Sequence, residues 1–115
     1  MKNNFKIKAA VLEKSKHPLV MKDIFLKEKI KTKQVLVKIY YSGICGSQIG
    51  EINAIKGKDK YLPHLLGHEA TGKVIQTNSL NSKFKIGDHV ILHWQKTKLK
   101  DSETPVYLDL QNRKI

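Results

Sequence analysis

Residues 33–51, with the sequence KQVLVKIYYSGICGSQIGE, carry the pattern that decides the fold class. In the first half of this stretch Val35, Val37, Ile39 and Tyr41 are spaced two residues apart. Side chains at that spacing share one face of an extended segment, so the pattern predicts a β-strand.

The spacing of the apolar residues changes to three after Cys45, where Ile49, Ile52 and Ile55 follow one another. This period is typical of a helix rather than a strand. Ser47 is suited to cap the first turn, because a serine side chain can accept a hydrogen bond from a backbone N–H there. A short helix is therefore expected directly after the cysteine.

Short β-rich runs also occur on both sides of this stretch. They lie at residues 7–13, 19–26, 72–78 and 88–94. Five short strands predict a mainly β domain, arranged as a barrel or sandwich. At 115 residues the chain has the length of a single domain, 1–115, although its tail at 95–115 shows little periodicity.

The charge of the chain is strongly positive, with 22 lysine and arginine residues against 10 acidic ones and a net charge of +12. Such a balance attracts phosphate backbones. However, Arg113 is the only arginine, and the lysines are scattered from Lys2 to Lys114 without a long run. Nucleic-acid readers favour clustered arginines, so specific nucleic-acid binding is not expected.

The sequence also bears on the cell compartment. The N-terminal apolar run is broken by charges at Glu13, Lys14 and Lys16, so neither a signal peptide nor a membrane span is predicted. Cys45 is the only cysteine, which excludes an internal disulfide and any zinc site built from four thiolates. A reducing compartment, the cytoplasm, is the expected location.

A cysteine, a histidine and a glutamate, whose side chains can bind metals, lie at the ends of predicted elements. Cys45 precedes the predicted helix, and His68 and Glu69 follow Gly67 at the start of a predicted strand. Thiolate sulfur and imidazole nitrogen are ligands that zinc prefers, and a helix N-terminus favours the thiolate form. Taken alone, Cys45 is also compatible with a buried thiol, and His68 with a packed histidine.

Three motifs extend this observation, namely SGICGSQ at 42–48, LPHLLGHEATGKVI at 62–75 and FKIGDHVIL at 84–92. In this order and spacing they resemble the N-terminal part of the medium-chain, zinc-dependent alcohol dehydrogenases, and the resemblance spans about residues 7–94. It implies a GroES-like fold, a partly open β-barrel with short helices.

The resemblance also implies roles for individual residues. Cys45 and His68 match two catalytic zinc ligands of that family, and Glu69 matches an acidic residue close to the metal that is sometimes an alternate ligand. Ser47 matches the hydroxyl that relays a proton from the alcohol. Gln48 stands where the family usually has an aspartate, which supports the metal-binding histidine from outside the ligand set.

The same resemblance implies a larger enzyme. In the family, hydride passes from an alcohol or polyol to NAD or NADP, which a Rossmann domain binds. No G-x-G-x-x-G motif occurs in this chain, so the expected product is part of a catalytic domain that ends before the Rossmann domain and is inactive alone. A Rossmann domain on a partner chain would complete it. The alternative is a non-catalytic GroES-like remnant or binding module, in which Cys45 is an ordinary thiol.

Overall fold

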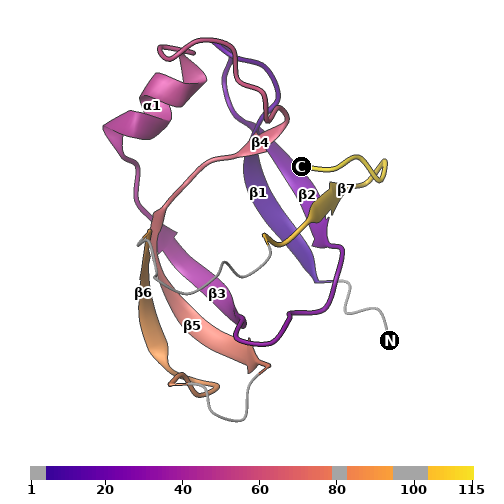
Figure 1. The fold of residues 1–115 in the computed structure, drawn as a ribbon, viewed down its shortest axis with the longest axis vertical. Coiled ribbons are helices and arrows are strands. Elements are labelled where there is room, and N and C mark those ends of the chain that lie inside the picture. Colours follow the sequence, from indigo (N-terminus) through magenta and orange to yellow (C-terminus); the bar gives the residue numbers. More distant parts are fainter. Residues whose placement is uncertain (1–4, 79–82, 95–103) are drawn as a thin grey trace. The chain divides into compact units, whose positions relative to one another are not determined.

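The computed structural model describes residues 5–78, 83–94 and 104–115, and within these it contains seven strands and one short helix (Figure 1). In chain order they are β1 (Lys6–Leu12), β2 (Val20–Leu26), β3 (Val35–Ser42), α1 (Gly46–Ile52), β4 (His64–Leu65), β5 (Glu69–Thr77), β6 (His89–His93) and β7 (Tyr107–Asp109). The prediction of a mainly β fold with a short helix is confirmed.

The elements agree closely with the sequence patterns, with two differences. Each of the five predicted strand segments overlaps with an observed strand, whereas β4 and β7 were not predicted. The helix ends at Ile52, earlier than the isoleucine spacing suggested. Beyond it the chain turns through Ala54, whose φ of 54° is incompatible with a continuing right-handed helix.

The chain divides into two compact units. Unit 1 consists of Met1–Lys29, Ile44–Leu66 and Pro105–Ile115, and unit 2 of Ile30–Gly43 and Gly67–Thr104. Each unit contains one antiparallel sheet, so each is considered by itself.

The sheet of unit 1 has the strand order β4-β1-β2-β7, and all of its pairings are antiparallel. Its core consists of Val11 and Leu12 on β1 and of Ile24 and Leu26 on β2, all of which are buried. The short strand β4 pairs with the end of β1, where His64 lies opposite Leu12. This pairing holds His64 at the edge of a packed sheet.

Strand β7 lies in the segment whose sequence showed no periodicity. Residues 95–103 of that segment lie outside the described residues, but 104–115 form β7 and a turn that returns beside it. The turn is held by Asp109, which is 3% exposed and accepts hydrogen bonds from the backbone N–H groups of Gln111 and Arg113. The guanidinium of Arg113 also donates to Asp109 and to Glu13. A buried carboxylate, rather than an apolar pattern, therefore organises this end of the chain.

The sheet of unit 2 has the order β3-β5-β6, with β5 in the centre. Val74 on β5 is fully buried, and at Gly72 the backbone of β3 leaves no room for a Cβ. The opposite face of the sheet is exposed. Thr71 on β5 pairs with Tyr41 on β3 and with Ile91 on β6, and the side chains of Tyr41 and Ile91 are 79% and 77% exposed. Among its described residues, unit 2 thus leaves several large apolar side chains exposed.

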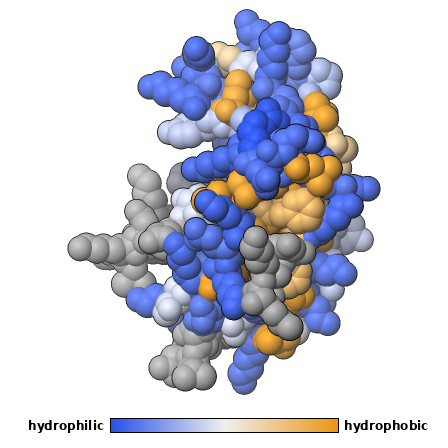
Figure 2. Space-filling view, turned by 90° about the vertical axis from the view of Figure 1, so that its right-hand side faces the viewer, coloured by the Kyte–Doolittle hydropathy of each residue, from blue (hydrophilic) through white to orange (hydrophobic). Residues whose placement is uncertain are grey.

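The surface agrees with the scattered distribution of lysines. The face shown in Figure 2 is mostly hydrophilic, with apolar patches between the polar side chains. Among the parts of the chain that the structure describes, no helix combines the length and the apolar character needed to cross a bilayer.

Candidate functional site

Cys45 is the residue that begins α1. Its backbone is extended (φ −103°, ψ 150°), and it forms the N-cap, with Gly46 as the first helical residue. The prediction that Ser47 caps the helix was wrong, because Ser47 is the second helical residue, two positions after the cap, and it is exposed. The thiol of Cys45 is half-buried at the positive end of the helix.

Gln48 makes the hydrogen bonds that hold Cys45 in this position. Its side-chain oxygen Oε1 accepts from the backbone N–H of Cys45 at 2.8 Å, and its own N–H donates to the Cys45 carbonyl at 3.0 Å. The first of these hydrogen bonds is one half of a capping box, in which the side chain of the third helical residue bonds to the backbone N–H of the cap residue. The amide oxygen at this position therefore orients the backbone of Cys45.

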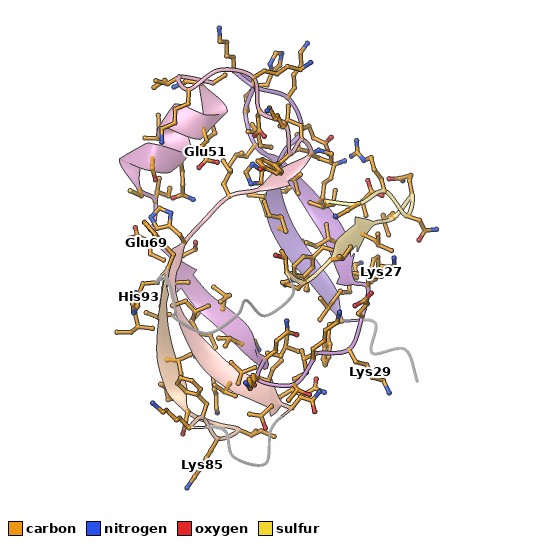
Figure 3. The ribbon with its side chains drawn as sticks, in the orientation of Figure 1. Lys27, Lys29, Glu51, Glu69, Lys85 and His93 are labelled. Carbon is orange, nitrogen blue, oxygen red and sulfur yellow. The ribbon has the colours of Figure 1, made fainter. Side chains whose placement is uncertain are left out.

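His68 and Glu69 lie at the start of β5. His68 is half-buried directly before the strand, and Glu69 is its first residue, opposite His93 on β6 (Figure 3). The carbonyl of Glu69 accepts the N–H of Gly43 at 2.9 Å. A Cβ at Gly43 would lie 2.7 Å from Cγ of Glu69, so the glutamate side chain crosses directly over this glycine. Only glycine permits that approach.

The four predicted site residues are divided between the two units. Cys45 and Ser47 belong to unit 1, and His68 and Glu69 to unit 2. The donor types, a thiolate and an imidazole, fit zinc. Over residues 5–78, 83–94 and 104–115, no cluster of three or more His, Cys, Asp and Glu side chains is arranged to hold a metal. The ligand set remains a prediction.

Three further histidines, His17, His89 and His93, lie at the surface. Nδ1 of His17 is 2.9 Å from the carbonyl of Ser15 in a loop. His89 and His93 are exposed on β6, where the ring of His89 lies 6.2 Å from that of Tyr40. These contacts are structural in character.

A cavity in unit 1 contains residues that the sequence patterns did not reveal. It has a volume of about 540 Å³ and is lined by α1 and by the loop that leads to β4, with Ser47, Glu51, Asp59, Tyr61 and His64 among its residues. In Figure 3 Glu51 projects from α1 on the side of β4. The cavity has the size of a small-molecule site, which is typically about 300–1,000 Å³.

Asp59 and His64 form a pair within this cavity. Oδ2 of Asp59 lies 3.1 Å from Nδ1 of His64, and Oδ1 accepts the N–H of Tyr61 at 2.7 Å. The Tyr61 N–H is the main cause that lowers the pKa of Asp59; burial opposes it and the His64 ring adds to it. The signal in the sequence is Asp59-x-Tyr61, since an aspartate often binds the N–H two residues ahead.

Comparison with known proteins places the chain in a family. Residues 31–107 match the family model described as the alcohol dehydrogenase GroES-like domain. D-arabinose 1-dehydrogenase (NADP(+)) of Saccharolobus solfataricus is 33% identical over 79% of this chain and 26% of its own length. An uncharacterized zinc-type alcohol dehydrogenase-like protein of Haemophilus influenzae is 36% identical over 76% of this chain and 25% of its own.

Solved structures agree with the sequence comparisons. An alcohol dehydrogenase from Thermotoga maritima matches with a TM-score of 0.61 and 36% identity, over 74% of this chain and 24% of that protein. The chain spans about a quarter of the length of the curated relatives it matches. With the β-sheets, the helix that begins at Cys45 and the family match in agreement, the chain belongs to the family of alcohol dehydrogenase GroES-like domains.

Proposed function

We propose that this chain is the N-terminal portion of the catalytic domain of a zinc-dependent alcohol or polyol dehydrogenase. In this proposal Cys45 and His68 are zinc ligands, and Glu69 is a third ligand or a carboxylate beside the metal. The observation that carries the proposal is the position of Cys45, a half-buried thiol at a helix N-terminus in the part of the chain that matches the family. Helix N-termini stabilise the thiolate that zinc requires.

Individual residues of this chain have separate roles in the proposed reaction. Zinc, when bound, would polarise the oxygen of the substrate. Ser47 accepts the hydroxyl proton of the alcohol and passes it towards solvent, for which its exposed position on the first turn of α1 is suitable. Gln48 keeps the backbone of Cys45 in place, and Gly43 leaves room for the side chain of Glu69.

NAD or NADP, bound by a Rossmann domain outside these residues, would accept the hydride from the substrate carbon. That domain belongs to another part of the protein or to a partner chain, so the 115 residues alone are inactive. Relatives named for D-arabinose and for D-arabitol phosphate support an alcohol or polyol substrate. The single cysteine, Cys45, is in keeping with a cytoplasmic enzyme.

Zinc content tests the ligand assignment. Purified wild-type chain should contain zinc, whereas Cys45→Ser and His68→Gln should contain much less, because each loses one donor. His17→Gln is the matched control, since His17 lies in an exposed loop, and it should keep the zinc of the wild type. Equal zinc in all four proteins would refute the assignment.

The second candidate function is a non-catalytic GroES-like module. It is favoured by Gln48, an uncharged residue that stands where the family usually has an aspartate. In that case a thiol reagent would label Cys45 at the same rate with and without zinc. Protection of Cys45 by zinc would exclude this candidate, and recovery of NAD(P)-dependent turnover on adding a Rossmann partner would establish the enzyme.

A further inference from the structure

Three lysines of the loop between α1 and β4 line the cavity of unit 1. Lys56, Lys58 and Lys60 are all exposed, and over residues 5–78, 83–94 and 104–115 none of them makes an ion pair with a carboxylate. Like charges so close along the chain repel one another, and a cavity with an excess of one sign of charge attracts the opposite sign. The loop therefore offers three ammonium groups to an anionic group of a ligand.

The carboxylates of the lining do not cancel this charge. Asp59 stands between two of the lysines in the sequence, but its side chain is only 9% exposed. Its Oδ1 accepts the Tyr61 N–H at 2.7 Å, and its Oδ2 lies 3.1 Å from Nδ1 of His64. Oε2 of Glu51, the other carboxylate, lies 3.8 Å from the same ring nitrogen. Two carboxylates against three lysines leave the lining with a net positive charge.

The backbone of the lysine loop is fixed before a ligand arrives. The N–H of Ile55 donates to the carbonyl of Gly50 at 3.0 Å, and the N–H of Gly57 donates to the carbonyl of Ala54 at 3.0 Å. At the other end of the loop, β4 pairs with β1. Because the loop is already ordered, binding does not have to order it, and the entropic cost of binding is smaller.

The rest of the cavity wall is largely apolar. Ile55 and Tyr61 line it and are 75% and 74% exposed, so both side chains can lose contact with water when a ligand binds. Burial of apolar surface is favourable, and small-molecule pockets typically combine apolar walls with a few polar groups that determine orientation. The lining thus favours a ligand that has an apolar body and a negatively charged group.

We propose that this cavity binds an organic anion, whose phosphate or carboxylate group lies at Lys56, Lys58 and Lys60 and whose apolar body contacts Ile55 and Tyr61. The inference goes beyond the proposed function, which states nothing about the charge of a ligand. It requires no zinc, because none of the proposed zinc ligands lines the cavity. It assigns a binding role to a lysine loop in which the sequence indicated no chemistry.

NMR titration of the whole chain with phenyl phosphate tests the proposal. The amide signals of residues 54–61 should shift in a saturable manner. Benzyl alcohol has an aromatic ring without the charge, and inorganic phosphate has the charge without a ring, so each should bind about tenfold more weakly or not at all. Benzoate, titrated in parallel, shows whether the lysines prefer phosphate or carboxylate. The inference is overturned if neither organic anion gives a saturable shift, or if benzyl alcohol or inorganic phosphate binds as tightly as phenyl phosphate.

Two triple variants of equal net charge test the role of the lysines. The first replaces the three lysines that line the cavity: Lys56→Gln, Lys58→Gln and Lys60→Gln. The second is the matched control and replaces three exposed lysines of unit 1 that do not line it: Lys8→Gln, Lys27→Gln and Lys29→Gln. The first variant should bind phenyl phosphate about tenfold more weakly, since each exposed charge contact contributes about two- to threefold, and the control should bind it as the wild type does. Equal affinities of the two variants would refute the site. Amide spectra establish that both variants are folded.

Glu51→Gln distinguishes an anion site from a site for neutral hydroxyl compounds. The substitution removes a negative charge from the lining, so phenyl phosphate should bind about twofold more tightly. Weaker binding would contradict the proposal, because Glu51 would then act as an acceptor for the ligand.

The same titration separates this inference from the proposed function. Phenyl phosphate should bind equally well to zinc-free Cys45→Ser, because the cavity lining does not include Cys45. If binding requires zinc, the ligand lies at the metal, so the anion site is refuted and the proposed function stands. Binding of phenyl phosphate in a wild-type chain that never binds zinc would refute the proposed zinc enzyme and leave the anion site in place.

Discussion

The sheets of unit 1 and unit 2 are both antiparallel, but they bury their side chains to different extents. Unit 1 joins strands from three distant parts of the sequence and encloses Val11, Leu12, Ile24 and Leu26. Unit 2 contains the two longest of the described strands, β3 and β5, yet one face of its sheet carries exposed apolar side chains such as Ile91. The difference shows that strand length does not determine how much core a sheet makes; the connections that cover it do.

The largest effect is expected from the core of unit 1. Leu12→Ala removes a fully buried side chain and leaves a cavity, so it should lower the free energy of unfolding by about 3 kcal/mol. Urea unfolding measures the loss, and hydrogen exchange should increase first in β1. An effect below about 1 kcal/mol would mean that this core is much less tightly packed than the structure indicates.

The tight contact between Gly72 and β3 in unit 2 should give the next largest effect. A Cβ at Gly72 would meet the carbonyl oxygen of Lys38 and lie 2.6 Å from Cγ1 of Val37. Because a backbone atom cannot yield as a side chain can, Gly72→Ala should cost about 1–3 kcal/mol and separate β3 from β5. Hydrogen exchange of the β3 amides tests this, and unchanged exchange would contradict it.

Acid should weaken the C-terminal turn of unit 1 through Asp109. Burial alone would raise the pKa of Asp109, but the N–H groups and guanidinium of Arg113 and the N–H of Gln111 lower it overall. The ionised carboxylate of Asp109 therefore stabilises the folded state fully above the unfolded-state pKa of about 3.9. This contribution is lost as the pH falls through the lower folded-state pKa.

Thermal unfolding between pH 6 and pH 2 measures this contribution. Asp109→Asn should be less stable at pH 6, and the difference from the wild type should shrink as the pH falls through the window set by the lowered pKa. Asp23→Asn serves as the control, because Asp23 makes a surface pair with Lys6. A constant difference at all pH values would show that the charge of Asp109 is not involved.

The smallest effect should come from the open face of unit 2. Ile91→Thr keeps a β-branched side chain at a position that is 77% exposed, so the stability of the chain should change by no more than about 0.5 kcal/mol. The melting temperature measures it. A large loss would mean that this face is covered in solution, which would remove the contrast between the two units.

Several features could be predicted from the sequence because they depend on neighbouring residues. Alternation of apolar residues located β1, β2, β3, β5 and β6, and the change of spacing after Cys45 located α1. The order of the Cys45, His68 and Gly87-Asp88 motifs indicated the family that residues 31–107 match. Each of these signals is local, or is a set of short motifs in a known order.

The tertiary structure alone decided what depends on contacts between separated residues. Strands β4 and β7 have two and three residues, too few for a periodic pattern, and they form because β1 and β2 offer them free edges. Cys45 rather than Ser47 caps α1, because the side-chain oxygen of Gln48 accepts a hydrogen bond from the backbone N–H of Cys45.

The contacts in the cavity of unit 1 were likewise not predictable from the sequence patterns. Asp59 stands in a run of lysines that looks like an exposed loop, and only folding turns its carboxylate inward to meet the ring of His64. The sequence by itself determined the strands, the helix and the family of this protein, because short-range spacing governs them. The pairing of its edges and the chemistry of its cavity were decided by the tertiary structure, because they depend on which distant groups the fold brings within hydrogen-bond distance.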